Sequence, residues 1–465
     1  MEARHVIFFA ALFVVVPLGS AWAARDGRIK DACAFILLIG TTRHDLQAIN
    51  FVSREWYRGT TRGFEICWLD FLWMILLGVE RCTRRPDHRG PWPASLLVML
   101  AFLAYNALNV AFSTPKLFGA FELSKMLRAI LVFVAVVHYV KGEREVRVLL
   151  WALAGAVFYE WVTAVFGRLG RGQERATGTL VHPNILSMYN LIAVPVLFAV
   201  ALSDTDPRLR RACAVTSLVG PLSVLLTVSR NGLFSMGLVL AGVGLTCGSL
   251  RLTWKKAAAA IGVVLVGVAS ISATWTSFQA RFAAAGGLQK EYHGKVYEGR
   301  GVYLDLANTI VSHEPWGCGL NNWSYWVSGR YGRMRQQYFV PYPSVDTPPP
   351  PRKRIRLRPN AHVDSPHSPP AHTLYGITLG ETGWAGVFVF GLLWIRWLQM
   401  TGSFLFNRSR ALVSRVGVGI FFGLVGAAAQ SITEWDFRAT PLLFLLHILL
   451  GIAAAMYPVR PSRRA

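Results

Sequence analysis

The sequence predicts an all-α membrane protein, a polytopic transmembrane helical bundle of 12 (possibly 13) spans with one large loop. Two observations predict this fold class. Of the 465 residues, 53% are hydrophobic and only 16% are charged, whereas a soluble domain is about 25% charged. The hydrophobic residues also fall in runs close to the roughly 20 residues that a helix needs to cross a bilayer. A soluble enzyme, a disordered chain and a disulfide scaffold are therefore excluded.

The spans follow from length and from low central charge. Residues 31–41 are apolar but short, so the count is 12 or 13. The first run ends in Ser20-Ala21-Trp22-Ala23, which resembles a signal-peptidase site, but the polytopic chain behind it favours an uncleaved first span. The expected spans are 6–22, 64–80, 91–113, 120–140, 147–167, 183–202, 211–228, 231–250, 257–277, 373–399, 411–433 and 439–457.

Basic residues in the short loops predict the orientation of the bundle. If the C-terminus is cytoplasmic, the short inner loops hold 19 Lys and Arg and the short outer loops hold 10. Residues 278–372 then form a large outer loop between N-terminal helices (1–277) and C-terminal helices (373–465). This loop holds 12 further Lys and Arg of a chain whose net charge is +23. Orientation alone does not explain basic residues on the outer side.

The end of the large loop has an unusual composition. Residues 341–371 include ten prolines and the basic run Arg-Lys-Arg-Ile-Arg-Leu-Arg at 352–358. Such a segment does not pack a core, so we expect an extended Pro/Arg-rich stretch after the short helices of the loop. The basic run is either a binding segment for an anionic acceptor or lipid headgroups, or a solvated insert.

Three residues on the outer side stand where helices are expected to begin. They are Arg230, Arg300 and His372. Arg300 opens a short amphipathic helix, which is indicated by Tyr303, Leu306, Ala307 and Ile310. A cation at a helix N-terminus opposes the macrodipole, and a bound phosphate would compensate. The same position disfavours imidazolium, so we expect His372 to be neutral and available as a base. Singly, lipid-headgroup anchors and an incidental loop histidine are the plainer interpretations.

Several short motifs follow one another between residues 175 and 386. They are Arg175-Ala176-Thr177-Gly178, His182-Pro183-Asn184, Ser229-Arg230-Asn231-Gly232, Gly299-Arg300, Pro315-Trp316-Gly317-Cys318-Gly319, His372-Thr373-Leu374-Tyr375 and Glu381-Thr382-Gly383-Trp384-Ala385-Gly386. Each motif is weak alone, but their order, spacing and topological side together resemble the O-antigen ligase and polymerase superfamily, over roughly residues 90–440.

The resemblance implies a glycosyltransferase of the bacterial inner membrane that needs no metal or other cofactor. It would transfer a glycan from an undecaprenyl pyrophosphate carrier to an acceptor hydroxyl at the periplasmic face. The family's two loop-facing arginines correspond to Arg230 and Arg300, and its catalytic histidine to His372. The family usually has Asn after that histidine, where this chain has Thr373, so His367 is a competitor. A neutral imidazole can accept the hydroxyl proton, and fixed arginines can stabilise a leaving pyrophosphate.

Four further residues are candidates for substrate binding. Arg175 stands in an outer loop rich in arginine, where an interfacial cluster is an equal alternative. His182 and Asn184 open a span and could bind sugar or phosphate, although helix capping by Asn184 is the plainer account. Glu381 lies two turns into its span, where a carboxylate is costly unless paired, so we expect it to orient a partner or line the cavity.

The sequence does not favour a metal site. His362, His367 and His372 are spaced by five, but prolines between them prevent one helical face from presenting all three, and no acidic cluster assists. Asp204-Thr205-Asp206 resembles the DxD motif of metal-dependent transferases but stands in a short inner loop. The six cysteines form no CxxC pair.

Alternatives remain for the partner and for the function. The acceptor is lipid A core for a ligase, another lipid-linked unit for an exopolysaccharide or O-antigen polymerase, or a protein hydroxyl. Residues 54–66 resemble members associated with exopolysaccharide. A transporter or flippase of a lipid-linked saccharide is the main competing class, and it would require ionisable residues along several spans. A scaffold of an export complex leaves the outer arginines unexplained. No feature indicates nucleic-acid binding.

Overall fold

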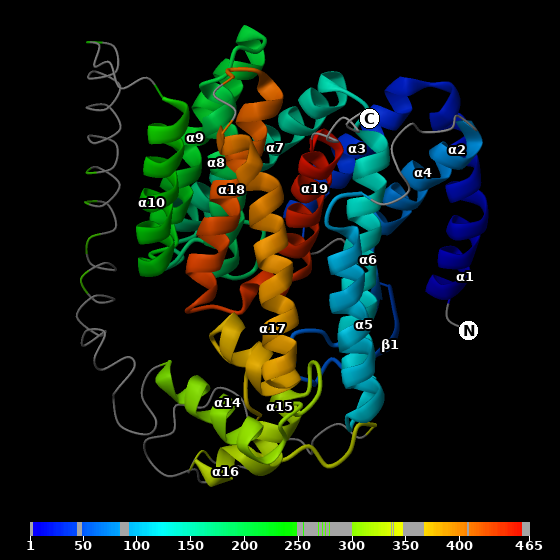
Figure 1. Ribbon diagram of the computed structural model, residues 1–465, viewed down its shortest axis with the longest axis vertical. Coiled ribbons are helices and arrows are strands. Elements are labelled where there is room, and N and C mark those ends of the chain that lie inside the picture. The colour runs from blue at the N-terminus through cyan, green and yellow to red at the C-terminus, as the bar shows by residue number, and fades with distance from the viewer. Residues whose placement is uncertain are drawn as a thin grey trace, which may run out of the picture.

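The computed structural model describes most of the chain, and helices dominate that part (Figure 1). Most of the expected span 257–277, the basic run 352–358 and His362 lie outside the described residues. The described residues are 3–43, 49–83, 93–248, 300–335, 337, 339–346, 367–406 and 409–457, with five single residues between 254 and 279.

The helices before the large loop are α1 (Ala3–Ala10), α2 (Val16–Arg25), α3 (Gly27–Ile39), α4 (Trp68–Thr83), α5 (Leu96–Phe112), α6 (Lys116–Tyr139), α7 (Glu143–Val165), α8 (Pro183–Ala201), α9 (Pro207–Leu226) and α10 (Arg230–Cys247). Those in the loop and beyond it are α14 (Gly301–His313), α15 (Trp323–Trp326), α16 (Gly332–Met334), α17 (Leu374–Gly402), α18 (Leu412–Ser431) and α19 (Thr440–Met456). Short helical turns are η1 (Ala11–Val15), η2 (Gly40–Thr42), η3 (Phe166–Gly170), η4 (Val327–Tyr331), η5 (Ser403–Phe406) and η6 (Asp436–Arg438).

Several of these helices have the length and composition of membrane spans. Among the described residues, α5 and α19 are apolar but slightly shorter, and α4 has only 16 residues. The protein is therefore all-α and of the membrane-spanning type, as predicted. Within the part of the chain that the structure describes, the six helices that are long and apolar enough to cross a membrane are Val6–Arg25, Glu143–Gly170, Pro183–Ala201, Pro207–Leu226, Leu374–Phe406 and Leu412–Ser431.

A short hairpin is an exception to the all-α prediction. It lies in the expected outer loop and pairs β1 (Ile49–Ser53) with β2 (Gly63–Ile66) in antiparallel register. Both strands are rich in the β-branched and aromatic residues that favour extended backbone. Because β2 takes residues 63–66, α4 begins at Trp68, later than the expected span.

The apolar segment 31–41 is a packed helix of the bundle. It forms α3, which begins after the capping residue Asp26. Gly40 lies against Leu69 at the start of α4, while Asp31 pairs with Arg144 at the start of α7 at 2.6 Å. α3 therefore runs antiparallel to α4 and parallel to α7, so the chain reverses direction twice between α2 and α4.

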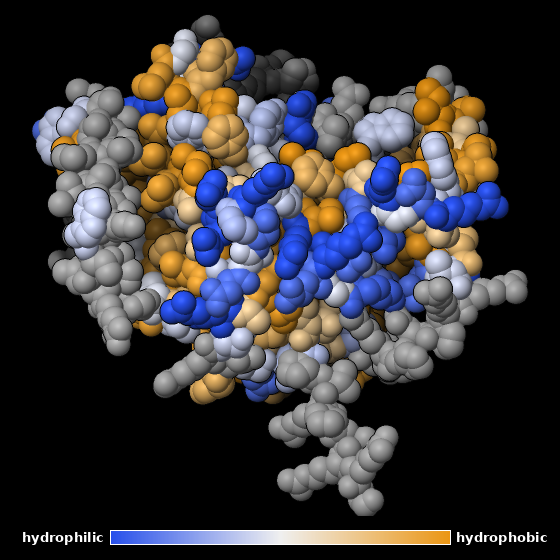
Figure 2. Space-filling view, turned by 90° about the horizontal axis from the view of Figure 1, so that it is seen from above, coloured by the Kyte–Doolittle hydropathy of each residue, from blue (hydrophilic) through white to orange (hydrophobic). Residues whose placement is uncertain are grey.

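The two ends of the bundle differ in what they carry. At the lower end of Figure 1, α14 to α16 lie beneath the starts of α10 and α17. Figure 2 shows the opposite end, where hydrophilic residues gather in the middle and hydrophobic residues lie at the rims. An ion pair there joins Lys141, just beyond α6, to Glu80 of α4 at 3.4 Å, and a second pair lies within α7, between Arg147 and Glu143 at 3.3 Å.

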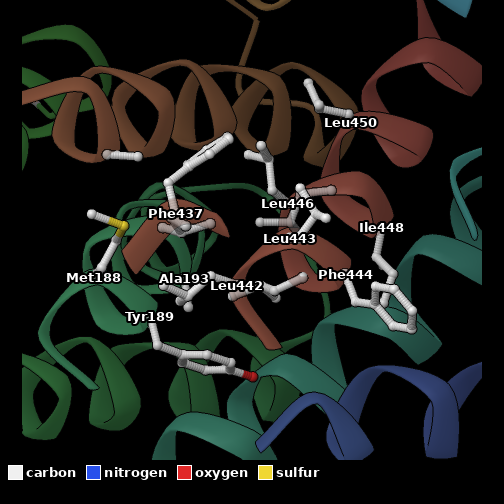
Figure 3. Close-up of a cluster of buried hydrophobic side chains, with 14 of the residues drawn as sticks. Met188, Tyr189, Ala193, Phe437, Leu442, Leu443, Phe444, Leu446, Ile448 and Leu450 are labelled. Carbon is white, nitrogen blue, oxygen red and sulfur yellow. The ribbon is translucent and has the colours of Figure 1, made fainter. Parts of the chain in front are cut away.

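The centre of the bundle is built around α8 and α19, which are buried on nearly all sides. Figure 3 shows Met188 and Tyr189 of α8 near Leu442 and Phe437, with the side chains of α19 filling the space between helices. α18 crosses α8 closely at Gly423, where a side chain would not fit: an added Cβ would lie only 2.8 Å from the Ile192 carbonyl oxygen. Small residues allow such close helix contact within a membrane. This packing fixes the ends of α8 and α18, from which the candidate site is built.

α17 is interrupted near its first third. Gly383 has φ +66, a left-handed conformation that favours glycine. The break frees backbone carbonyls, and neighbouring groups satisfy them. Cys318 and Gly319 donate their N–H groups to the carbonyls of Gly380 and Glu381, each at 2.9 Å. The motif at 315–319 thus closes the break in the motif at 381–386, although more than 60 residues separate them.

Candidate active site

The centre of the candidate site is the buried carboxylate of Glu434, just beyond α18. Its Oε1 atom accepts hydrogen bonds from Arg300 Nη2 at 2.8 Å and from Asn184 Nδ2 at 2.7 Å. Its Oε2 atom lies 3.2 Å from His372 Nδ1. Three segments that are 62 to 250 residues away in the sequence therefore converge on one side chain.

Glu434 is ionised at neutral pH. Burial raises the pKa of its carboxyl. The hydrogen bond and charge of His372, the charge of Arg300 and the hydrogen bond of Asn184 together lower that pKa by more than burial raises it. The resulting pKa is below the usual range. An ionised carboxylate only accepts hydrogen bonds, so His372 Nδ1 carries the proton and donates it to Glu434. The His372 Nε2 atom is then left as the acceptor when the ring is neutral.

The His372 side chain is accessible at the start of α17. It precedes α17, whose first turn is capped by the Thr373 hydroxyl, which accepts a hydrogen bond from Gly376 N–H at 3.4 Å. The His372 side chain is 37% exposed. The competitor His367 is buried, stacked on Tyr342 with ring centroids 3.9 Å apart, and its Nδ1 lies 2.7 Å from the Val340 carbonyl. The geometry therefore favours His372 over His367 as a reachable base.

Arg300 is held by the helix that the sequence predicted. It stands immediately before α14, where the expected buried residues Leu306, Ala307 and Ile310 face the core. The amphipathic helix beginning at this point is therefore confirmed. The Arg300 side chain is 22% exposed beside Glu434.

Arg175 extends the same network to a second loop. Its Nε donates to the Thr227 carbonyl at 2.8 Å, and its Nη2 donates to Asn184 Oδ1 at 2.8 Å. Asn184 thus bridges Arg175 and Glu434. The expectation that Asn184 caps α8 is wrong, because His182 is the N-cap and its Nδ1 accepts the Asn184 N–H at 3.3 Å. His182 takes the cap because the helix already begins at Pro183, which places Asn184 inside the first turn.

Arg230 is the first residue of α10 and lies three residues beyond Thr227. The next residue, Asn231, donates to the Thr433 hydroxyl at 2.7 Å, directly before Glu434. The motif Ser229-Arg230-Asn231-Gly232 is therefore hydrogen-bonded to the turn that carries Glu434. Arg230, Arg300, Arg175 and His372 all occur at one end of the bundle, as predicted from topology.

Glu381 lies in a separate buried charge cluster. Its Oε2 atom pairs with Arg438 Nη1 at 2.5 Å. Lys125 Nζ donates to the Arg438 carbonyl at 2.7 Å and pairs with Glu122 at 2.8 Å. Two anions and two cations thus balance one another. The expectation that Glu381 orients a partner matches this pairing, and that partner anchors the turn that carries Glu434.

Replacing Glu381 by alanine should destabilise the protein by about 3–5 kcal/mol, because it leaves the buried Arg438 guanidinium unpaired. Thermal unfolding of the detergent-solubilised full chain measures the effect. Glu314→Ala is the matched control, since Glu314 and Arg330 form a half-exposed pair at 3.7 Å and such pairs contribute about 0–1 kcal/mol. Equal melting temperatures for the two variants would contradict a stabilising role for the cluster.

The site carboxylate Glu434 and the neighbouring charged residues Asp436 and Arg438 are found only in the structure. They stand in the short stretch Thr433-Glu434-Trp435-Asp436-Phe437-Arg438 between two apolar helices. Three charged residues in so short a connection are the sequence feature that could have indicated them. Among the described residues, no group of three or more His, Cys, Asp or Glu side chains could hold a metal ion.

No family model matches this chain, and no curated protein matches it.

Proposed function

We propose that the protein is a glycosyltransferase of the bacterial inner membrane that uses an undecaprenyl pyrophosphate-linked glycan. The observation that carries the proposal is the joining of His372, Glu434 and Arg300, with Arg175 linked to them through Asn184. This arrangement combines an oriented base with a group of anion-binding arginines. It is what transfer from a pyrophosphate to a hydroxyl requires.

The proposed reaction is a direct displacement. His372 Nε2 accepts the proton of the acceptor hydroxyl while the hydroxyl oxygen attacks the anomeric carbon of the donor sugar. The bond from that carbon to the pyrophosphate oxygen breaks, and the leaving pyrophosphate gains one negative charge. Arg300, Arg175 and Arg230 stabilise that charge. Displacement from the opposite side inverts the anomeric configuration.

The proposed topology has 12 or 13 spans, with the site facing the periplasm. The bias of basic residues toward the short inner loops supports this orientation. Helices α14 to α16 then cover the periplasmic end, and the segment after them leads into α17 (Figure 1). The acceptor is a glycan, lipid A core or protein hydroxyl, so both ligase and polymerase activities are included.

Charged residues inside the helices support an enzyme over a transporter. Arg128 pairs with Asp70 at 2.6 Å, and Lys125 with Glu122 at 2.8 Å. These matched pairs are buried and hydrogen-bonded, which is the pattern of structural charges. A pathway for ions or protons requires ionisable residues that line a route and change state.

The proposal is tested with the full chain reconstituted in liposomes, with lipid-linked glycan donor, acceptor and EDTA. We expect a new glycosidic bond to form, with the inverted configuration and with release of undecaprenyl pyrophosphate. Movement of intact donor between leaflets without bond formation would support a flippase and overturn the proposal. A product that retains the donor configuration would contradict direct displacement.

A further inference from the structure

The carboxyl of Asp436 is buried beside the site without a role in the reaction described above. It lies in η6, two residues after Glu434, and is 3% exposed. Its Oδ2 atom is buried and has no hydrogen-bond partner among the described residues. Glu434, by contrast, has three side-chain partners. Buried polar atoms are rarely left unpaired, so this one requires an explanation.

The surroundings of Asp436 favour its neutral form. Its Oδ2 lies 4.0 Å from His182 Nδ1, the atom that accepts the Asn184 N–H at 3.3 Å. Burial raises the pKa of Asp436 well above its usual range, and the charge of Glu434 raises it further. Arg175 and Arg300 lower it by less. The same two arginines are the proposed phosphate-binding groups.

We propose that Asp436 is protonated in the resting protein and donates a hydrogen bond to a phosphate oxygen of the bound pyrophosphate. The inference rests on the proposed function. The proton stays on Asp436 throughout, since the acceptor proton goes to His372 and the pyrophosphate leaves with the bonding electron pair. The hydrogen bond strengthens as the phosphate gains charge. A second ionised carboxylate beside Glu434 would instead repel the pyrophosphate and offset the arginines.

Two substitutions separate a neutral from an ionised carboxyl. Asp436→Asn keeps a neutral donor of the same shape, whereas Asp436→Leu removes the donor. Binding of undecaprenyl pyrophosphate to the full chain in nanodiscs is measured at pH 7. We expect the Asn variant to bind within about threefold of the wild type. The Leu variant should bind roughly 10- to 100-fold more weakly, as expected for loss of a hydrogen bond to a charged group.

Three results would overturn the role of Asp436. They are binding by the Asn variant that is more than about threefold tighter or weaker than that of the wild type, Leu binding equal to that of the wild type, and no binding by the wild type. If the Leu variant does not fold, the Asn variant still decides the charge state. A glycan-transfer assay on the wild type runs in parallel. Pyrophosphate binding without transfer would refute the proposed function while the variants still decide the role of Asp436.

Discussion

Replacing His372 by alanine lowers the rate of glycan transfer by about 100- to 10,000-fold, the usual contribution of a positioned general base. The acceptor alcohol is then attacked without a group to take its proton. Because His372 is partly exposed and contacts Glu434 through one atom, the variant should fold and still bind undecaprenyl pyrophosphate. The measurement is the single-turnover rate with donor and acceptor at saturation.

The matched control is His313→Ala, which removes an exposed histidine from the end of α14 and should leave the rate nearly unchanged. In the native host, His372→Ala also distinguishes the acceptors. Full polymer accumulating on the carrier indicates a ligase, and single repeat units on the acceptor indicate a polymerase. Wild-type glycan levels and chain lengths would remove His372 from the mechanism.

Replacing Arg300 by alanine lowers the transfer rate by about 100- to 1,000-fold, the range for loss of one preorganised charge-stabilising donor. The substitution removes a guanidinium from the leaving pyrophosphate and a partner from Glu434. Arg300→Lys should recover little of the rate, because an ammonium does not present the planar fork that holds two oxygens.

Arg171→Ala is the control for Arg300. Arg171 is exposed in the loop before Arg175. Its guanidinium carbon lies over the Phe166 ring, 5.0 Å from the ring centroid. It should transfer at close to the wild-type rate, because its charge is held at the protein surface. Equal losses for Arg171→Ala and Arg300→Ala would indicate a general effect of outer charge on the membrane surface. Steady-state rates at several donor concentrations measure both variants.

The helices could largely be predicted from the sequence, because a lipid-facing helix needs a long apolar run. The expected span 183–202 is α8 at Pro183–Ala201, and 439–457 is α19 at Thr440–Met456. The helix after Arg300 was predicted from apolar spacing alone. Whether segment 31–41 forms a span was ambiguous, because its apolar run is shorter than a membrane helix needs. In the structure its apolar residues are buried against α4 and α7, and the sequence does not show those contacts.

The pairing within the site could not be predicted from the sequence. Glu434 is 62 residues from His372 and 250 from Asn184, and no local pattern joins them. The position of a carboxylate in the loop between two spans does not indicate which side chains it will contact. The break at Gly383 was also missed, because glycine occurs within ordinary membrane helices. Its meaning depends on the carbonyls that residues 318 and 319 satisfy from another segment.

The most direct test of the site is a cryo-EM structure of the full chain in nanodiscs with undecaprenyl pyrophosphate. We predict that the two phosphates lie beside Arg300, within hydrogen-bond distance of its guanidinium, with His372 Nε2 open toward the adjoining space. Arg175 or Arg230 should contact the same phosphates. Pyrophosphate bound instead at the opposite end, near Lys141 and Arg147, would contradict the account.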